Sequence, residues 1–197
     1  SADRLAADVN VVGSYLAERY WPQIHKLADE QPQPGFTPYS GMAHRVAAEL
    51  DDASSRSWLD QAMARQTTMA DTHPALNERL KAIGETPRLA PPAPGETADR
   101  LLGAALNAIT EGFDRRWKDK ILPAWQERHR EVEEARHHLA EVTARHDSGA
   151  ELTLQDAYDR ARLTESVGGD ADAAREQFRA LHVRAPEEAS RLGNLKA

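Results

Sequence analysis

Cysteine is absent from the 197-residue sequence. Disulfides and thiolate metal sites are therefore excluded, and cysteine usage gives no guide to the redox compartment. No apolar run is long enough to cross a bilayer. A basic cluster is missing too, because 25 Lys and Arg residues alternate with 32 Asp and Glu residues, for a net charge of −7. A nucleic-acid partner, which needs a basic face, is therefore not expected.

β-Branched residues are few, whereas Ala, Leu, Arg and Glu dominate the composition. These residues favour helices, so the sequence predicts an all-α fold of one or two small domains. A first helix is predicted over 3–28, with a kink or restart at Pro22. Short helices are predicted over 42–50 and after a cap at Asp51 or Asp52. The apolar stripe of the first helix consists of Leu5, Val9, Val12, Leu16, Tyr20 and Ile24.

Prolines mark the clearest boundary in the chain, at residues 87–96. This composition favours an extended, semi-rigid connector after a first part, 1–86. Residues 97–148 then carry apolar side chains every three or four positions, which predicts a long helical region. Pro123 falls inside it, so we expect either a kinked helix or a break that gives a helical hairpin. Residues 149–197 form the last helical part.

A helix start is predicted at Asp71-Thr72-His73-Pro74. Thr72 or His73 occupies the expected cap position, and Pro74 suits the first helical position, where a missing N–H costs nothing. Gly84 and Pro87 end this helix. The positive end of the helix would favour a neutral His73 ring, which can serve as a polar group aimed into a cleft. The alternative is an ordinary surface histidine.

The segment Thr72-His73-Pro74, followed by Glu78-Arg79-Leu80, resembles a segment of the zinc metallopeptidase family that contains the CAAX prenyl protease and the heat-shock protease HtpX. In that family the histidine faces the active site and supports the transition-state oxyanion, which implies this role for His73. The Ala2-Asp3 pair matches a second family position. By resemblance, Asp3 orients a zinc-binding histidine from the second shell.

The same resemblance implies that the zinc ligands lie outside this sequence. The family's third ligand is a glutamate shortly before the Ala-Asp pair, and that position would precede Ser1. None of the eight histidines forms the H-E-x-x-H motif that holds zinc and activates water. We therefore expect a fragment of a zinc metalloendopeptidase, inactive by itself, whose parent takes protein or peptide substrates. The family also implies a membrane-anchored parent, on the cytoplasmic side.

The tail resembles a tetratricopeptide unit. A turn at Gly168-Gly169-Asp170 separates two helical patterns, and the positions of Gly169, Ala174, Phe178 and Pro186 match the repeat. The Trp/Leu-Gly pair that normally opens the repeat is absent. A lone unit cannot bury its faces, so it must pack on the preceding helices or on further repeats. An ordinary helical hairpin is the alternative.

Three interpretations of the role of this chain stay open at this point. The chain is either the protease fragment or a non-enzymatic helical adaptor that binds a peptide or a partner protein. A third possibility is that it pairs with a separate N-terminal part of the same protein.

Glu134 and His137 have the Glu-x-x-His spacing of di-iron bundles. Because no second such motif exists, a solvated helix face is the favoured interpretation there.

Overall fold

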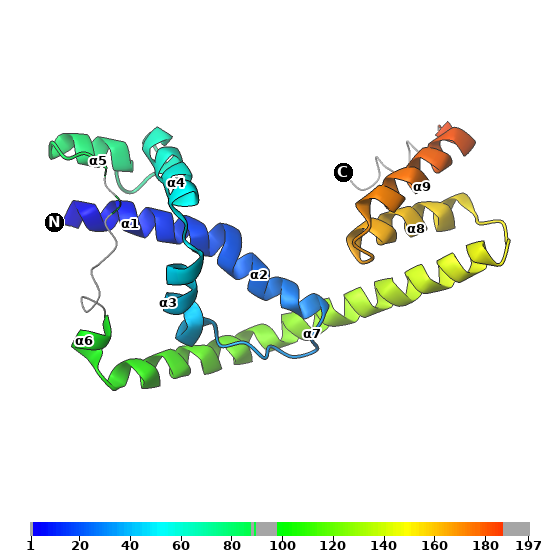
Figure 1. Cartoon of the computed structure of the whole chain (residues 1–197), viewed down its shortest axis with the longest axis horizontal. Coiled ribbons are helices and arrows are strands. Elements are labelled where there is room, and N and C mark those ends of the chain that lie inside the picture. The colour runs from blue at the N-terminus through cyan, green and yellow to red at the C-terminus, as the bar shows by residue number, and fades with distance from the viewer. Residues whose placement is uncertain (1, 88, 90–97, 187–197) are drawn as a thin grey trace. The chain divides into compact units, whose positions relative to one another are not determined.

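The computed structural model describes residues 2–87, 89 and 98–186, and every regular element in that part of the chain is helical. The all-α prediction is therefore confirmed. Figure 1 shows the elements in chain order. They are α1 (Ala2–Tyr15), a π-helical turn (Leu16–Tyr20), α2 (Trp21–Lys26), a 3-10 turn (Leu27–Asp29), α3 (Pro38–Glu49), α4 (Asp52–Ala64), α5 (Leu76–Ala82), α6 (Ala98–Leu102), α7 (Ala105–Asp147), α8 (Leu154–Ser166) and α9 (Ala171–Arg184).

The chain divides into two compact units. The first contains Ser1–Ala28 and Gln33–Pro123, and the second contains Asp29–Pro32 and Ala124–Ala197. Most of the proline-rich stretch 87–96 lies outside the described residues, so the connector there stays a prediction.

A π-helical turn sets the buried face of the first unit. The buried residues Val11, Tyr15, Tyr20 and Ile24 are spaced by four, five and four positions. The step of five falls on Leu16–Tyr20, where the π-turn inserts one extra residue. Before this turn, the predicted apolar stripe therefore lies on a different side of the helix from the residues that are buried. Val9, which we expected inside, is 60% exposed, whereas Val11 is 1% exposed.

Helices α1, α4 and α5 pack on one another in the first unit, as Figure 1 shows. Asp51 caps α4, as predicted, by accepting a hydrogen bond from the Ser54 N–H at 2.7 Å. The Tyr15 and Trp58 rings meet edge to face at 6.3 Å, and the Trp58 indole N–H donates to Glu18 at 2.8 Å. The α4 tryptophan therefore combines apolar burial with a satisfied polar group.

A buried carboxylate ties α3 to α7. Asp114 is only 3% exposed. It accepts hydrogen bonds from the Tyr39 N–H at 2.8 Å, the Ser40 N–H at 3.2 Å and the Ser40 hydroxyl at 2.5 Å. Thr37, at the cap position of α3, provides no side-chain bond. Asp114 thus satisfies the free N–H groups at this helix start from another helix, and its negative charge suits the helix N-terminus.

Helix α7 continues through Pro123 as a single 43-residue element. Of the two predicted alternatives, a single helix through Pro123 is present, and the break into a hairpin is wrong. A proline removes only one backbone N–H, and packed neighbours can hold a helix together across that gap. Ile121 before the proline is half-buried, and Trp125 after it is buried, which keeps the four-residue apolar step intact.

In the second unit, α7 holds the segment Asp29–Pro32. The Trp125 indole N–H donates to the Gln31 carbonyl at 2.7 Å. Arg128 forms an ion pair with Asp29 at 2.7 Å, and Arg136 donates to the Asp29 carbonyl at 2.7 Å. These contacts satisfy backbone carbonyls at the end of the 3-10 turn and in the loop that follows it.

Helices α8 and α9 form an antiparallel pair joined by a glycine turn. Thr153 and Asp170 cap the two helices through their side chains. Gly169 has φ +72°, and a Cβ on Gly168 would lie 2.7 Å from the Thr164 carbonyl oxygen. Both glycines are therefore required by the turn. The predicted turn and helix pair are present, while their assignment to the tetratricopeptide family stays a prediction.

Candidate functional site

His73 lies in the loop between α4 and α5, and its side chain is exposed. Helix α5 begins only at Leu76, and Ala75 occupies its cap position without a side-chain hydrogen bond. The prediction that Thr72 or His73 caps this helix and that Pro74 is its first residue is therefore wrong. His73 is not placed at a helix end.

The cap of α5 comes from an earlier residue in the loop. The Thr67 hydroxyl accepts a hydrogen bond from the Ala75 N–H at 2.7 Å and donates to Glu78 at 2.7 Å. Glu78 also accepts from the Thr67 N–H at 3.2 Å. This arrangement differs from a capping box, because the hydroxyl accepts from the N–H of Ala75 at the cap position and not from the N–H of Glu78. Thr67 thus takes the role that we predicted for Thr72.

A second contact closes the first part of this loop. Asp71 accepts hydrogen bonds from the Thr68 N–H at 2.7 Å and from the Thr68 hydroxyl at 2.8 Å. These bonds, the backbone one first, lower the pKa of the Asp71 carboxyl below its usual value. The loop that carries His73 is therefore held at Thr67, Thr68 and Glu78.

Asp3, the other predicted site residue, lies at the start of α1. Its side chain is outside the described part of the structure. Helix α1 contacts α5, which follows His73 in the chain. The sequence places Leu76, Leu80 and Ile83 on one face of this helix; Leu76 and Leu80 are buried, whereas Ile83 is 49% exposed. The helix that carries Ala2-Asp3 therefore contacts the helix that follows the Thr72-His73-Pro74 loop.

The described residues include no group of three or more His, Asp or Glu side chains that would hold a metal ion. Glu134 pairs with Arg130, and His137 lies 3.7 Å from Glu141, all on an exposed stretch of α7. The solvated-face interpretation of these two residues is confirmed. Among the helices described, none has the length and apolarity needed to cross a membrane.

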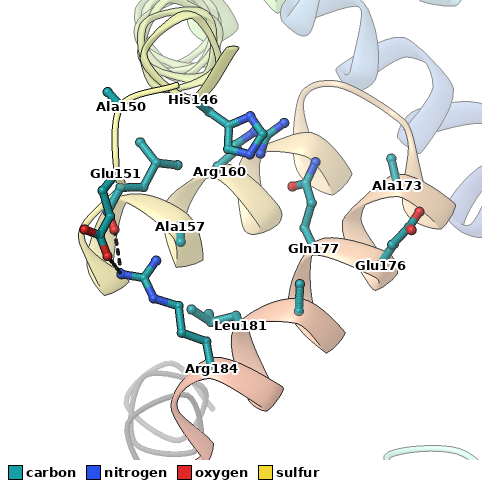
Figure 2. A pocket seen from close by; sticks show the side chains of 12 residues that line it. His146, Ala150, Glu151, Ala157, Arg160, Ala173, Glu176, Gln177, Leu181 and Arg184 are labelled. Carbon is teal, nitrogen blue, oxygen red and sulfur yellow. Dashed lines mark hydrogen bonds and ion pairs between the residues drawn. The ribbon is translucent and has the colours of Figure 1, made fainter. Parts of the chain in front are cut away.

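The second unit contains a groove of about 580 Å³ between the end of α7, α8 and α9 (Figure 2). Its apolar lining includes Leu152, Ala157 and Leu181, of which Leu152 and Leu181 are buried. Arg184 donates to Glu151 at 3.2 Å and to the Leu152 carbonyl at 3.0 Å, which fixes one wall. Such a mixture of apolar floor and polar rim is typical of ligand grooves.

Polar donors gather at the other end of the groove. Figure 2 shows His146, Arg160 and Gln177 on that side. Arg160 Nε is buried without a hydrogen-bond partner among the described residues. Gln177 accepts a hydrogen bond from the Thr164 hydroxyl at 3.2 Å through its side-chain oxygen. Because an unpaired buried donor is costly, Arg160 is a candidate for binding an acceptor group of a ligand.

The sequence analysis missed these polar residues because it followed only the apolar positions of the two helices. A usable signal was present. Gln177, Leu181 and Arg184 are four and three positions apart, so they share a face of α9. A polar-apolar-polar face of this kind indicates a surface that is neither fully buried nor fully solvated.

No family model, curated protein or solved structure matches this chain.

Proposed function

We propose that this chain is a helical part of a zinc metallopeptidase and that it contributes His73 to the oxyanion site of that enzyme. One observation carries the proposal. The Ala2-Asp3 helix and the helix that follows Thr72-His73-Pro74 pack together in one unit, so the two motifs of the resemblance are not scattered over the molecule. An exposed histidine on a loop held at both ends is free to face a site formed with other residues.

The zinc itself finds no ligand set among the described residues. The chain's sequence also lacks the H-E-x-x-H motif. We therefore assign no metal-dependent step to this chain. Its proposed roles are a hydrogen bond from the His73 ring to the developing oxyanion and second-shell support from Asp3.

The first experiment measures metal content and proteolysis of the purified chain. We expect no stoichiometric zinc by elemental analysis and no digestion of casein. Stoichiometric zinc together with cleavage would show that the catalytic centre is in this sequence and would contradict the proposal.

The second experiment tests His73 in the protease that contains this chain together with the zinc-binding part. Loss of an oxyanion donor lowers kcat by roughly 10²- to 10³-fold. His73→Ala should therefore lower kcat on this scale with little change in KM, whereas His44→Ala, which removes another exposed histidine, should leave kcat unchanged. Equal kinetics for the wild type and His73→Ala would refute the assigned role.

A second candidate function is a non-enzymatic adaptor that binds a peptide or partner protein, and the groove of Figure 2 favours it. Peptides selected from a displayed library against the chain provide the probe. On this alternative, Arg160→Ala should weaken their binding at least tenfold, while Arg179→Ala, which removes an exposed arginine outside the groove lining, should not. Selected peptides that bind equally to both variants would exclude the groove as their site.

A further inference from the structure

A second hollow lies on the first unit, where the start of α7 meets the start of α3. It has a volume of about 420 Å³, and we call it the basic aromatic groove. It is lined by Tyr39, Phe113, Arg116, Trp117, Lys120 and Ile121. Two of these residues are cations and three are aromatic, and none is acidic. The zinc-peptidase proposal uses none of them.

The positions of these residues on α7 explain this composition. At about 100° per residue, Arg116, Lys120, Phe113 and Trp117 fall within a sector of about 100° of the helix surface. Ile109 belongs to the same sector and is 42% exposed, while Phe113 is 44% exposed. Glu111 projects from the opposite side, and the Asp114 carboxylate is buried on α3. No carboxylate lines the groove itself, whereas Asp119 lines the neighbouring hollow together with Ile109 and Arg116. Exposed apolar side chains beside two cations are an unusual surface for a chain of net charge −7.

The walls of the groove are held in place. The Tyr39 and Phe113 rings lie 5.4 Å apart, and Trp117 packs against Trp21 at 6.3 Å. The Tyr39 backbone is fixed by its 2.8 Å hydrogen bond to Asp114. A groove with walls held in this way loses little conformational entropy when it binds a partner.

The two cations are available for a partner. The Arg116 guanidinium lies 4.8 Å from the centre of the Phe113 ring. No hydrogen bond of the Arg116 guanidinium is found within the described residues, so its N–H groups can donate to a partner. Neither Arg116 nor Lys120 forms an ion pair within the described residues, whereas Arg128, Arg130, Arg136 and Arg145 farther along α7 are all paired with carboxylates. Charge complementarity therefore favours an anionic occupant for this groove.

We propose that the basic aromatic groove docks an acidic amphipathic helix of a partner protein. Arg116 and Lys120 are one turn apart, about 6 Å along the helix axis, which matches carboxylates at positions i and i+4 of a partner helix. An aromatic or leucine side chain on the same face of the partner would enter the hollow beside Phe113 and Trp117. A hollow suits an inserted side chain, while a flat lipid surface would not fill it.

The test begins with a displayed library of helical peptides selected on the whole chain. We expect enriched peptides to carry Asp or Glu at i and i+4 with an aromatic residue or leucine on the same face. Synthetic, fluorescein-labelled copies should then lose at least tenfold in affinity, measured by anisotropy, when the chain carries Arg116→Glu and Lys120→Glu.

The matched control is Arg115→Glu with Lys118→Glu, which makes the same charge change on the same helix outside this groove. It should change affinity less than twofold, and circular dichroism should show that both variants remain folded. Equal losses of peptide affinity in the two double variants would show that the overall charge of the chain causes the effect, and would overturn the proposal. Enriched peptides without an acidic pair would also overturn it. Binding of the chain to vesicles of phosphatidylcholine and phosphatidylserine in place of peptides would do the same. A dimer of this chain that dissociates only with Arg116→Glu and Lys120→Glu would assign the groove to a second copy and overturn it as well.

Discussion

Single residues decide where helices begin in this protein, and the deciding residues are often distant in sequence. Thr67 and Glu78 cap α5 across a loop, and Asp114 caps α3 from α7. Capping rules consider neighbours within one turn, so they pointed to Thr72 or His73 for α5, and neither fills this role. Asp51, whose partner Ser54 is three positions away, was one of the two caps predicted for α4 and is the one observed. Local caps are readable from sequence, while caps that depend on tertiary contacts are not.

Asp114→Ala should destabilise the protein strongly. The substitution leaves the Tyr39 and Ser40 N–H groups without their acceptor, and each unsatisfied buried group costs about 1–3 kcal/mol. We expect a loss of about 2–4 kcal/mol in the free energy of unfolding, measured by urea denaturation. Asp119→Ala, an exposed site on the same helix, should stay within about 0.5 kcal/mol of the wild type. Equal stabilities for the two variants would contradict the assigned role of Asp114.

Tyr15 should make stability depend on alkaline pH. Burial, followed by its hydrogen bond to Glu49, raises the pKa of Tyr15 to about 12 from an ordinary value of 10.0. The folded state therefore holds the phenol proton more tightly, so this contribution is complete below pH 10 and is lost between pH 10 and 12. Burial also raises the pKa of Tyr20, so Tyr15→Phe should remove only part of the slope. Urea midpoints between pH 9 and 12 provide the measurement, and an unchanged slope in Tyr15→Phe would contradict it.

At the scale of elements, the sequence predicted the helices well and their buried faces less well. Leu76 and Leu80 of α5 are on the predicted face, but the stripe of α1 is shifted by the π-turn. Periodicity analysis assumes 3.6 residues in every turn, and a single π-turn changes the register on one side of it. At Pro123 the local preference left a kinked helix and a break both open, and the structure has one continuous helix there.

Valine substitutions test the shifted register of α1. Val11→Ala should cost about 2 kcal/mol of unfolding free energy, because it removes two methyl groups from the core. Val9→Ala should cost less than about 0.5 kcal/mol, since Val9 is exposed. The reverse order in urea denaturation would restore the regular stripe that the sequence suggested.

The turn between α8 and α9 should tolerate neither glycine substitution. Gly169→Ala forces a side chain into a left-handed conformation, which costs about 1–2 kcal/mol. Gly168→Ala should cost at least as much, because its Cβ would lie 2.7 Å from the Thr164 carbonyl oxygen. Gly13→Ala, with open space around it inside α1, should instead stabilise the protein by about 0.5–1 kcal/mol. Thermal unfolding by circular dichroism distinguishes these outcomes.

At the scale of the whole molecule, composition alone was sufficient for the fold class. The scarcity of β-branched residues and the wealth of Ala, Leu, Arg and Glu predicted a helical protein, and the described residues are helical. The two grooves were beyond this reasoning. Each is formed by residues from different segments of the chain, such as Tyr39 with Trp117 and Leu152 with Leu181, and their proximity follows only from tertiary packing.

The effect of zinc on folding can be measured on the whole chain. On the proposal that the zinc ligands lie outside this chain, neither zinc nor a chelator should act on its folded state. We expect thermal midpoints with EDTA and with added zinc to agree within about 1 °C, because only a ligand that prefers the folded state raises its stability. A rise of several degrees with zinc would reveal a metal site and change the assignment of this chain.

The π-turn of residues 16–20 also has a consequence for chain length. The buried residues Tyr15 and Tyr20 are separated by five positions instead of four, so the turn contains one residue more than the packing of these side chains needs. Deleting one residue between Leu16 and Arg19 would restore an ordinary helix in which Val11, Tyr15, Tyr20 and Ile24 still face the same way. This turn is therefore where the amino-terminal helix can lose a single residue and keep its contacts, whereas a deletion within the turns on either side would rotate half of the core toward water.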